Sequence, residues 1–223
     1  FAIDWIGVNA GTAVMEVRPA IVLGENRVYP IVSIARSNDF ISRFFPVEDR
    51  IETYMDTEKL LPVEIKIHQR EGDRTKNRQV SYDRKNKKAV QLEEGKEERF
   101  DMDPSAQDAL SVLYFFRNMK FPAEGATTVI KVFEGDKNWD LEIKMLGKES
   151  VETPAGNFNA VKVIVMAKYE GLFLNKGDIT IWFADDKKHT PVQMRSRVTI
   201  GSVTVRLISM ESPAETFENT PAK

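Results

Sequence analysis

Histidines, cysteines and acidic residues are the side chains best suited to catalysis or metal binding, and this sequence arranges few of them for either. The two histidines, His68 and His189, do not occur in a spacing that places two imidazole nitrogens on one metal ion. The sequence contains no cysteine, which excludes disulfides, thiolate metal ligands and cysteine nucleophiles. We therefore expect no metal site and no cofactor, and we interpret both histidines as surface residues.

Acidic residues gather in several places without forming a recognisable site. Asp185 and Asp186 directly follow a predicted strand, where adjacent side chains point to opposite faces, and a hard cation needs more oxygen ligands than this segment offers. The acids near residues 101–103 and 149–152 lie beside turns, and nothing in their spacing predicts the facing carboxylates of a glycosidase. Turn formation explains these residues better than catalysis.

The motifs of the common enzyme classes are also missing. The sequence contains no Gly-x-Ser-x-Gly nucleophile elbow, no phosphate-binding Gly-x-x-x-x-Gly-Lys-Ser/Thr loop and no Gly-x-Gly-x-x-Gly dinucleotide fingerprint. The 32 basic and 34 acidic residues give a formal charge of -2, so no overall field attracts nucleic acid, and we expect no nucleic-acid partner. A non-catalytic protein is the favoured class, and a hydrolase is a remote alternative.

Two connectors between predicted strands are unusually apolar and are candidates for binding. They span residues 39–47 and 171–175. Large apolar side chains in connectors must be buried in the protein, in a partner or in a membrane surface. The first connector either folds onto the core, which is the commoner arrangement, or contacts a lipid or a partner protein; in the second, we expect Phe173 to be a docking residue. The candidate contact residues are Phe40, Phe44, Phe45, Leu172, Phe173 and Leu174.

Residues 101–121 contain the one strong helix pattern in a sequence that otherwise reads as strands and turns. Asp103 suits the N-cap, Pro104 suits the first helical position, and Pro122 ends the segment. Apolar residues at helical spacing form a wide face that must be covered on more than one side. The spacing predicts a helix over about 104–119.

The remaining elements are predicted strands in hairpins. Residues 138–147 alternate most cleanly, with Trp139, Leu141 and Ile143 pointing to one face. In the strand 178–184, apolar residues occupy one face and Trp182 the other, so both faces are expected to be covered. A helix beside such strands either packs into a filled core or leaves a cavity for an acyl chain. Tyr114 and Trp182 join the candidate ligand-binding residues on this basis.

These elements predict a mainly β fold: a single curved antiparallel sheet, or half-open β-barrel, with one principal helix packed on its concave side. We expect a single domain over 1–210, in which two β halves are joined by the 101–121 helix segment. Residues 211–223 are polar and are expected to form a flexible tail. The chain starts within a predicted strand, so we expect upstream residues, including an export signal.

Four blocks resemble a known family when they are taken together and in order. They are Ile6–Ala13, the Asp103–Arg117 helix segment, Gly147–Phe158 and Trp182–Asp186 followed by Pro191-Val192. With these blocks the chain resembles the bacterial family called domain of unknown function 3108, over nearly its whole length. The resemblance implies an exported protein of the Gram-negative envelope with a curved, barrel-like antiparallel sheet, and it supplies no catalytic residues.

We accordingly predict a non-catalytic cell-envelope protein, periplasmic or associated with the outer membrane, that binds a lipid or other apolar ligand in or at the mouth of the curved sheet. The alternative is a scaffold or assembly partner that docks on another envelope protein through an apolar loop or a sheet edge. No run of about 18 apolar residues predicts a transmembrane helix, so any membrane contact is expected to be peripheral.

Overall fold

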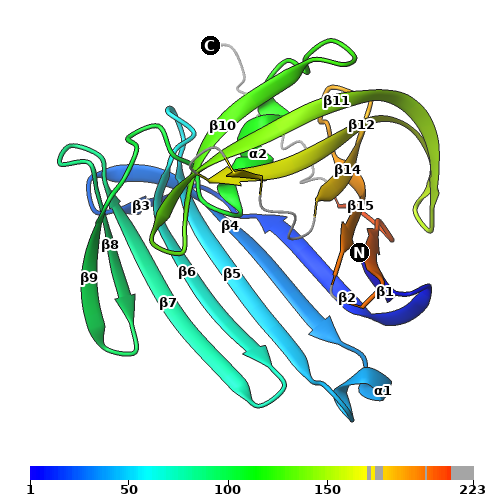
Figure 1. Ribbon diagram of the computed structural model, residues 1–223, viewed down its shortest axis with the longest axis horizontal. Helices are drawn as coiled ribbons and strands as arrows, with labels where there is room; N and C mark the ends of the chain where they lie inside the picture. Colours follow the sequence, from blue (N-terminus) through cyan, green and yellow to red (C-terminus); the bar gives the residue numbers. More distant parts are fainter. Residues whose placement is uncertain (170–171, 174–177, 199, 212–223) are drawn as a thin grey trace, which may run out of the picture.

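The computed structural model describes residues 1–169, 172–173, 178–198 and 200–211. Within them, 16 strands form one antiparallel sheet that curls around a helix, as Figure 1 shows. The N-terminal strands are β1 (Ala2–Trp5), β2 (Val8–Val17), β3 (Ile21–Leu23), β4 (Asn26–Ser37), β5 (Val47–Asp56), β6 (Pro62–Glu71), β7 (Arg74–Asp83), β8 (Lys88–Glu93) and β9 (Lys96–Asp101). The C-terminal strands are β10 (Thr127–Glu134), β11 (Lys137–Thr153), β12 (Gly156–Tyr169), β13 (Leu172–Phe173), β14 (Ile179–Ala184), β15 (Pro191–Arg197) and β16 (Ser202–Arg206). The predicted curved antiparallel sheet is confirmed.

The first and the last strand in the sequence meet in the middle of the sheet. β1 pairs with β2 on one side and with β16 on the other, with Ala2 opposite Arg206. The sheet path therefore runs from β10 through β12, β14 and β16 to β1, and onward through β4 to β9. The edges are β9 and β10, which are consecutive strands in the sequence.

The principal helix, α2, spans Ser111–Asn118 and is shorter than the predicted 104–119. The expected cap at Asp103 is wrong, because this side chain accepts hydrogen bonds from the Ser105 N–H and hydroxyl in a separate turn. Asp108 instead accepts from the backbone N–H of Ser111 at 2.6 Å, and Ser111 Oγ accepts from the backbone N–H of Asp108 at 2.8 Å. These two reciprocal hydrogen bonds resemble those of a capping box and lie at the start of the helix.

The chain between β9 and α2 closes the gap between the two sheet edges, which explains why it is not helical. Gln107 donates its backbone N–H to the Lys131 carbonyl and accepts from the Phe133 N–H, each at 2.8 Å, so it forms an isolated parallel bridge to β10. The ring of Phe133 is almost fully buried, and its centroid lies 6.3 Å from that of Phe100 on β9. Tertiary hydrogen bonds have replaced the intrahelical ones that local propensity favours.

Helix α2 lies between two parts of the core. One cluster joins Phe116 to Ile143, Val163 and other apolar residues of the C-terminal strands, and another joins Tyr114 to the N-terminal strands. A second, short helix, α1 (Asp39–Ser42), lies in the connector between β4 and β5. Neither helix has the length and apolarity needed to cross a membrane. The single domain over 1–210 and the flexible tail over 211–223 stay predictions, and residues 212–223 lie outside the described residues.

Candidate functional site

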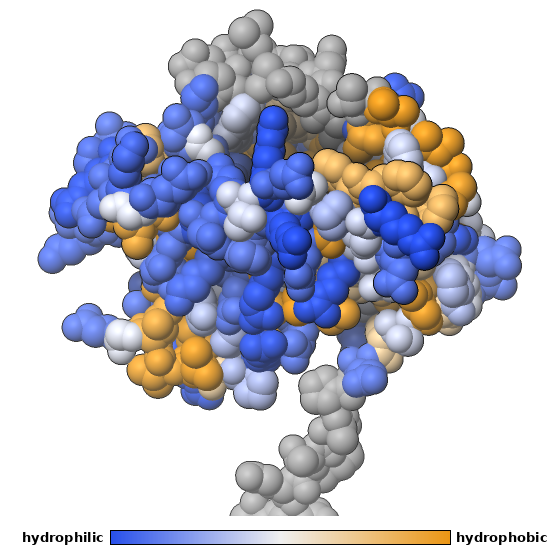
Figure 2. All heavy atoms as spheres, turned by 90° about the horizontal axis from the view of Figure 1, so that it is seen from below, coloured by the Kyte–Doolittle hydropathy of each residue, from blue (hydrophilic) through white to orange (hydrophobic). Residues whose placement is uncertain are grey.

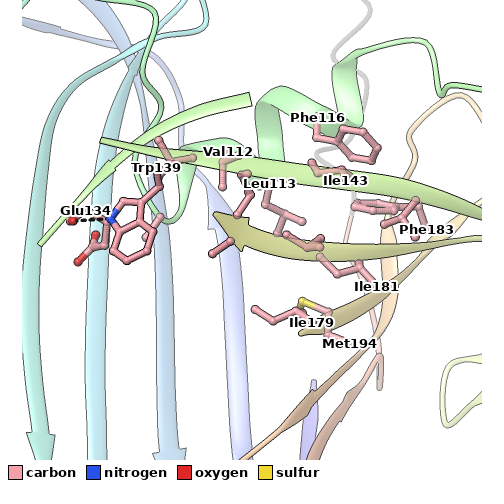
Figure 3. A pocket seen from close by; sticks show the side chains of 16 residues that line it. Val112, Leu113, Phe116, Glu134, Trp139, Ile143, Ile179, Ile181, Phe183 and Met194 are labelled. Carbon is pink, nitrogen blue, oxygen red and sulfur yellow. Dashed lines mark hydrogen bonds between the residues drawn. The ribbon is translucent and has the colours of Figure 1, made fainter. Parts of the chain in front are cut away.

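An apolar cavity of about 430 Å³ lies between α2 and the C-terminal strands. Figure 3 shows side chains approaching it from the helix on one side and from the strands on the other. Its lining residues are Ala109, Val112, Leu113, Phe116, Val132, Glu134, Trp139, Leu141, Ile143, Val163, Val165, Ala167, Ile179, Ile181, Phe183 and Met194. Fifteen of these sixteen are apolar.

Strand alternation and register produce this wall. Ile143 on β11 is paired with Val165 on β12, which is paired in turn with Ile179 on β14. Residues in register on neighbouring antiparallel strands present their side chains to the same face, so the three form one apolar row. A parallel row continues from β12 through Ile181 to Met194 on β15.

The cavity has a deep end and a rim. Phe116, Ile143 and Phe183 are buried, and the ring centroids of Phe116 and Phe183 lie 5.6 Å apart. Ile179 is 39% exposed and Leu141 is half-buried, which places these side chains at the rim. A ligand entering past Ile179 would bury its leading end against the aromatic floor.

One end of the cavity carries its polar groups. Figure 3 places Trp139 and Glu134 together, at the end opposite Phe183. The Trp139 indole N–H donates to the Glu134 backbone carbonyl at 2.9 Å, so the ring lines the cavity with its polar atom already satisfied. The Glu134 carboxylate pairs with the buried guanidinium of Arg78 on β7.

This lining is suited to binding apolar groups. Apart from Glu134, the lining side chains hold no titratable group and no hydroxyl. The carboxylate of Glu134 is engaged by Arg78 across the gap between the sheet edges. Burial of apolar surface is the interaction that this cavity offers, at about 25 cal/mol per Å².

Asp108 fixes the helix that forms one wall of the cavity. It is fully buried, its carboxylate is hydrogen-bonded to the Thr53 hydroxyl of β5, and it accepts from the Leu110 N–H at 2.9 Å. Burial raises the pKa of this carboxyl above its usual value, and the hydrogen bonds to the carboxylate oppose that rise. Asp108 is thus a positioning group and has no access to the cavity lining.

The first apolar connector is exposed, so the expectation that it folds onto the core is wrong. Phe44 is 78% exposed and Phe40 is 61% exposed, and their ring centroids lie 5.8 Å apart in an edge-on arrangement. Phe45 is also exposed and lies close to Gly72 on the neighbouring hairpin. Asn38 caps α1 within this connector, with Asn38 Oδ1 accepting from the Ile41 N–H at 2.9 Å. The binding role of these three rings stays a prediction.

Tyr114 and Trp182 are buried, and neither lines the cavity. Tyr114 faces the N-terminal strands, in a cluster with Ile31 and Met55. Trp182 lies on the opposite face of β14 from Ile181, where its indole N–H donates to Glu149 Oε1 at 2.6 Å. The expectation that both faces of this strand are covered is confirmed.

The second apolar connector is described only in part. Leu172 and Phe173 form β13, which pairs with the end of β12 through Lys168 and Tyr169. Leu174 lies outside the described residues. The docking role of Phe173 stays a prediction.

Sequence reasoning missed the cavity lining as a set, although the signal was present in parts. The alternation of Trp139, Leu141 and Ile143, and that of Ile179, Ile181 and Phe183, correctly grouped six of the lining residues by face. What was lacking was the strand register that brings the two groups to one wall.

Comparison with known proteins places the chain in a family. The family model described as protein of unknown function, DUF3108, matches residues 1–208. The chain belongs to the DUF3108 family. This confirms the resemblance found in the sequence blocks.

One solved structure confirms the fold of this DUF3108 chain at low sequence identity. A β-barrel-like protein of domain of unknown function DUF1849 from Brucella abortus has a TM-score of 0.58 and 10% identity, covering 91% of this chain and 88% of that chain. A "putative lipoprotein" from Parabacteroides distasonis ATCC 8503 has a TM-score of 0.32 and 13% identity, covering 92% and 90%. Among curated proteins, none matches the sequence.

Proposed function

We propose that this DUF3108 protein binds a lipid or other apolar ligand, with an acyl chain lying in the cavity between α2 and the C-terminal strands. One observation carries the proposal: a space of about 430 Å³ lined by fifteen apolar residues, with a buried aromatic floor and a more exposed rim. Ligand pockets in proteins measure about 300–1,000 Å³ and are mostly apolar. The cavity falls in that range.

The size of the cavity favours an extended aliphatic ligand over a very small one. An apolar cavity of about 150 Å³ holds a benzene molecule, so this one accommodates a molecule on the order of three times larger. Water is poorly stabilised in a cavity of this kind, because the walls offer it almost no hydrogen-bonding partners. Filling it with methylene groups would contribute about 0.8 kcal/mol for each buried methylene.

Binding is a better proposal than catalysis for the same site. The lining provides no nucleophile, and its one acidic side chain is paired with a buried arginine. We therefore propose a non-catalytic role. The export to the cell envelope that the sequence resemblance implies forms part of the same proposal, and cell fractionation tests it.

The direct test is recovery of ligand with the protein. Native mass spectrometry of protein purified from cells, together with solvent extraction of lipids, should detect a bound aliphatic molecule. The purified protein should also take up a dansyl-labelled fatty acid with saturable fluorescence enhancement. Protein that is repeatedly free of ligand and takes up no probe would contradict the proposal.

A matched pair of variants on β12 locates the uptake. Ala167 lines the cavity near its rim, whereas the next residue toward the N-terminus, Met166, lies on the opposite face of the same strand. Ala167→Trp should reduce probe uptake at least tenfold by occupying the mouth. Met166→Trp places the same ring on the other face and should leave uptake unchanged. Equal uptake by both variants would mean that the probe binds outside this cavity.

A further inference from the structure

Three turns at one end of the sheet carry exposed apolar side chains. They are the β1–β2 turn with Ile6, the α1 connector with Phe40 and Phe44, and the β15–β16 turn with Ile200. Ile200 is 67% exposed and Ile6 is 57% exposed. Figure 2 views the molecule from the side on which α1 lies in Figure 1 and shows hydrophobic areas set among hydrophilic ones. We call these three turns the turn cluster.

Hydrogen bonds join the turns into one surface. The Trp5 indole N–H of the first turn donates to the Ile200 carbonyl of the third at 2.9 Å. Asn38, which caps α1, donates its side-chain amide to the Asn9 carbonyl of β2 at 2.8 Å. The turn cluster is therefore contiguous, although its parts come from opposite ends of the sequence.

The apolar side chains of the turn cluster are held in exposed positions by the fold. Asn38 fixes the first turn of α1, and Phe40 and Phe44 contact each other edge-on. Exposed apolar area costs about 25 cal/mol per Å², and patches of such area usually mark an interaction surface. The arrangement consists of projecting turns, and flat bilayer surfaces accept such turns without a matching groove.

Basic side chains outnumber acidic ones within the turn cluster. Residues 5–8 carry no charge, residues 39–45 carry Asp39 and Arg43, and residues 197–201 carry Arg197, which gives two positive charges against one negative. Among the described residues, no carboxylate forms an ion pair with Arg43 or Arg197. Both arginines are thus available to phosphate groups, next to aromatic and aliphatic side chains.

From these observations we propose that the turn cluster docks on the surface of an anionic phospholipid bilayer. Phe40, Phe44 and Ile200 would enter the boundary between headgroups and acyl chains, and Arg43 and Arg197 would contact lipid phosphates. Aromatic side chains favour this interfacial zone, and basic residues near it add attraction to anionic lipids. This inference is independent of the cavity, because none of the cavity-lining residues belongs to the turn cluster.

Vesicle co-sedimentation tests the proposal with the intact chain. Wild-type protein should bind vesicles of phosphatidylcholine mixed with phosphatidylglycerol, and bind vesicles of phosphatidylcholine alone more weakly. The Phe40→Ser/Phe44→Ser double variant should bind the mixed vesicles at least tenfold more weakly. Arg43→Gln should reduce the preference for the mixed vesicles.

A matched control removes two exposed apolar side chains from another part of the sheet. Ile21 and Val22 are exposed on β3, which belongs to none of the three turns. Ile21→Ser/Val22→Ser should bind vesicles as the wild type does, and urea unfolding of both double variants confirms that each is folded. Wild-type protein that binds neither vesicle type, or equal loss of binding in the two double variants, would overturn the proposal.

Discussion

Asp108 and Thr53 are hydrogen-bonded to each other in the interior, although 55 positions separate them in the sequence. The same carboxylate accepts from the backbone N–H groups of Leu110 and Ser111 at the start of α2. One side chain therefore attaches the helix to β5 and holds it over the cavity.

Removal of this carboxylate should destabilise the fold. Asp108→Ala leaves two helix N–H groups without an acceptor and leaves the buried Thr53 hydroxyl only the more distant Glu64 carbonyl at 3.4 Å, at a cost of about 2–4 kcal/mol in the free energy of unfolding. Asp103→Ala is the control, because that half-buried carboxylate caps only a local turn and its loss should cost less than about 1 kcal/mol. Urea unfolding measures the free energy of unfolding of both variants. Similar losses in the two would contradict the role of Asp108 in attaching α2 to β5.

The same carboxyl should leave a signature in the pH dependence of stability. Its folded-state pKa is raised above the usual 3.8, so above that pH the native state holds a proton that the unfolded state has lost. This contribution is present in acid and is lost as the pH rises through the folded-state pKa. The stability advantage of the wild type over Asp108→Asn should therefore grow as the pH is lowered toward 4, and an advantage constant with pH would contradict the shift.

Glu149 should show the opposite sign. The hydrogen bond from the Trp182 indole lowers the pKa of Glu149 below its usual 4.5, so its contribution is present at neutral pH and is lost as the pH falls through that lowered value. Trp182 fluorescence should change in this acid range. Glu149→Gln keeps an acceptor oxygen and should remove the step, while Trp5 and Trp139 give the same background in both proteins. If the change in fluorescence persists in Glu149→Gln, it arises from the titration of another group.

The two kinds of phenylalanine in this protein should respond differently to truncation. Phe133 is almost fully buried between the two sheet edges, and Phe133→Ala should cost about 3–5 kcal/mol through lost burial and a new cavity. Phe44 lies in solvent, and Phe44→Ala should change stability by no more than about 0.5 kcal/mol. Thermal or urea unfolding compares them, and a large loss in Phe44→Ala would place that ring in the core.

Two glycines should separate steric from conformational cost. A Cβ at Gly11 would overlap the backbone carbonyl of Arg36 on the paired strand β4, which cannot move without breaking the ladder, so Gly11→Ala should cost about 2–3 kcal/mol or more. Gly24 has a φ of +59 with open space around it, and Gly24→Ala should cost about 1 kcal/mol from the left-handed backbone alone. Equal effects would mean that β4 yields to the added methyl group.

Strand positions were well predicted because period-2 alternation is a local property. The alternation around Ile143 predicted β11, and the same argument separated Trp182 from Ile181 on β14. Register is not local, and for that reason the apolar wall of the cavity was not identified from the sequence.

Errors occurred where tertiary contacts override local preference. Asp103 and Pro104 read as a helix start, but Gln107 pairs with β10 and moves the start of α2 beyond it. Tyr114 and Trp182 are large and aromatic, which makes them candidates for ligand contact, yet each fills a core on the face away from the cavity. The composition of residues 40–45 was consistent with burial or exposure, and the structure shows the three phenylalanine rings exposed.

The pairing of β1 with β16 has a consequence for how the chain folds. On one side β1 is joined to β2 by a tight hairpin, whereas on the other side Ala2 meets Arg206, a partner that is synthesised much later. Long-range pairing of this kind raises the contact order and slows folding, because the entropy of closing a long loop must be lost before the pairing stabilises anything. During translation the outer edge of β1 stays open, and the aggregation hazard of an unpaired strand lasts until β16 arrives. A circular permutant in which a short linker joins β16 to β1 and the chain opens between β9 and β10 would turn this pairing into a hairpin while keeping every strand beside its present neighbours.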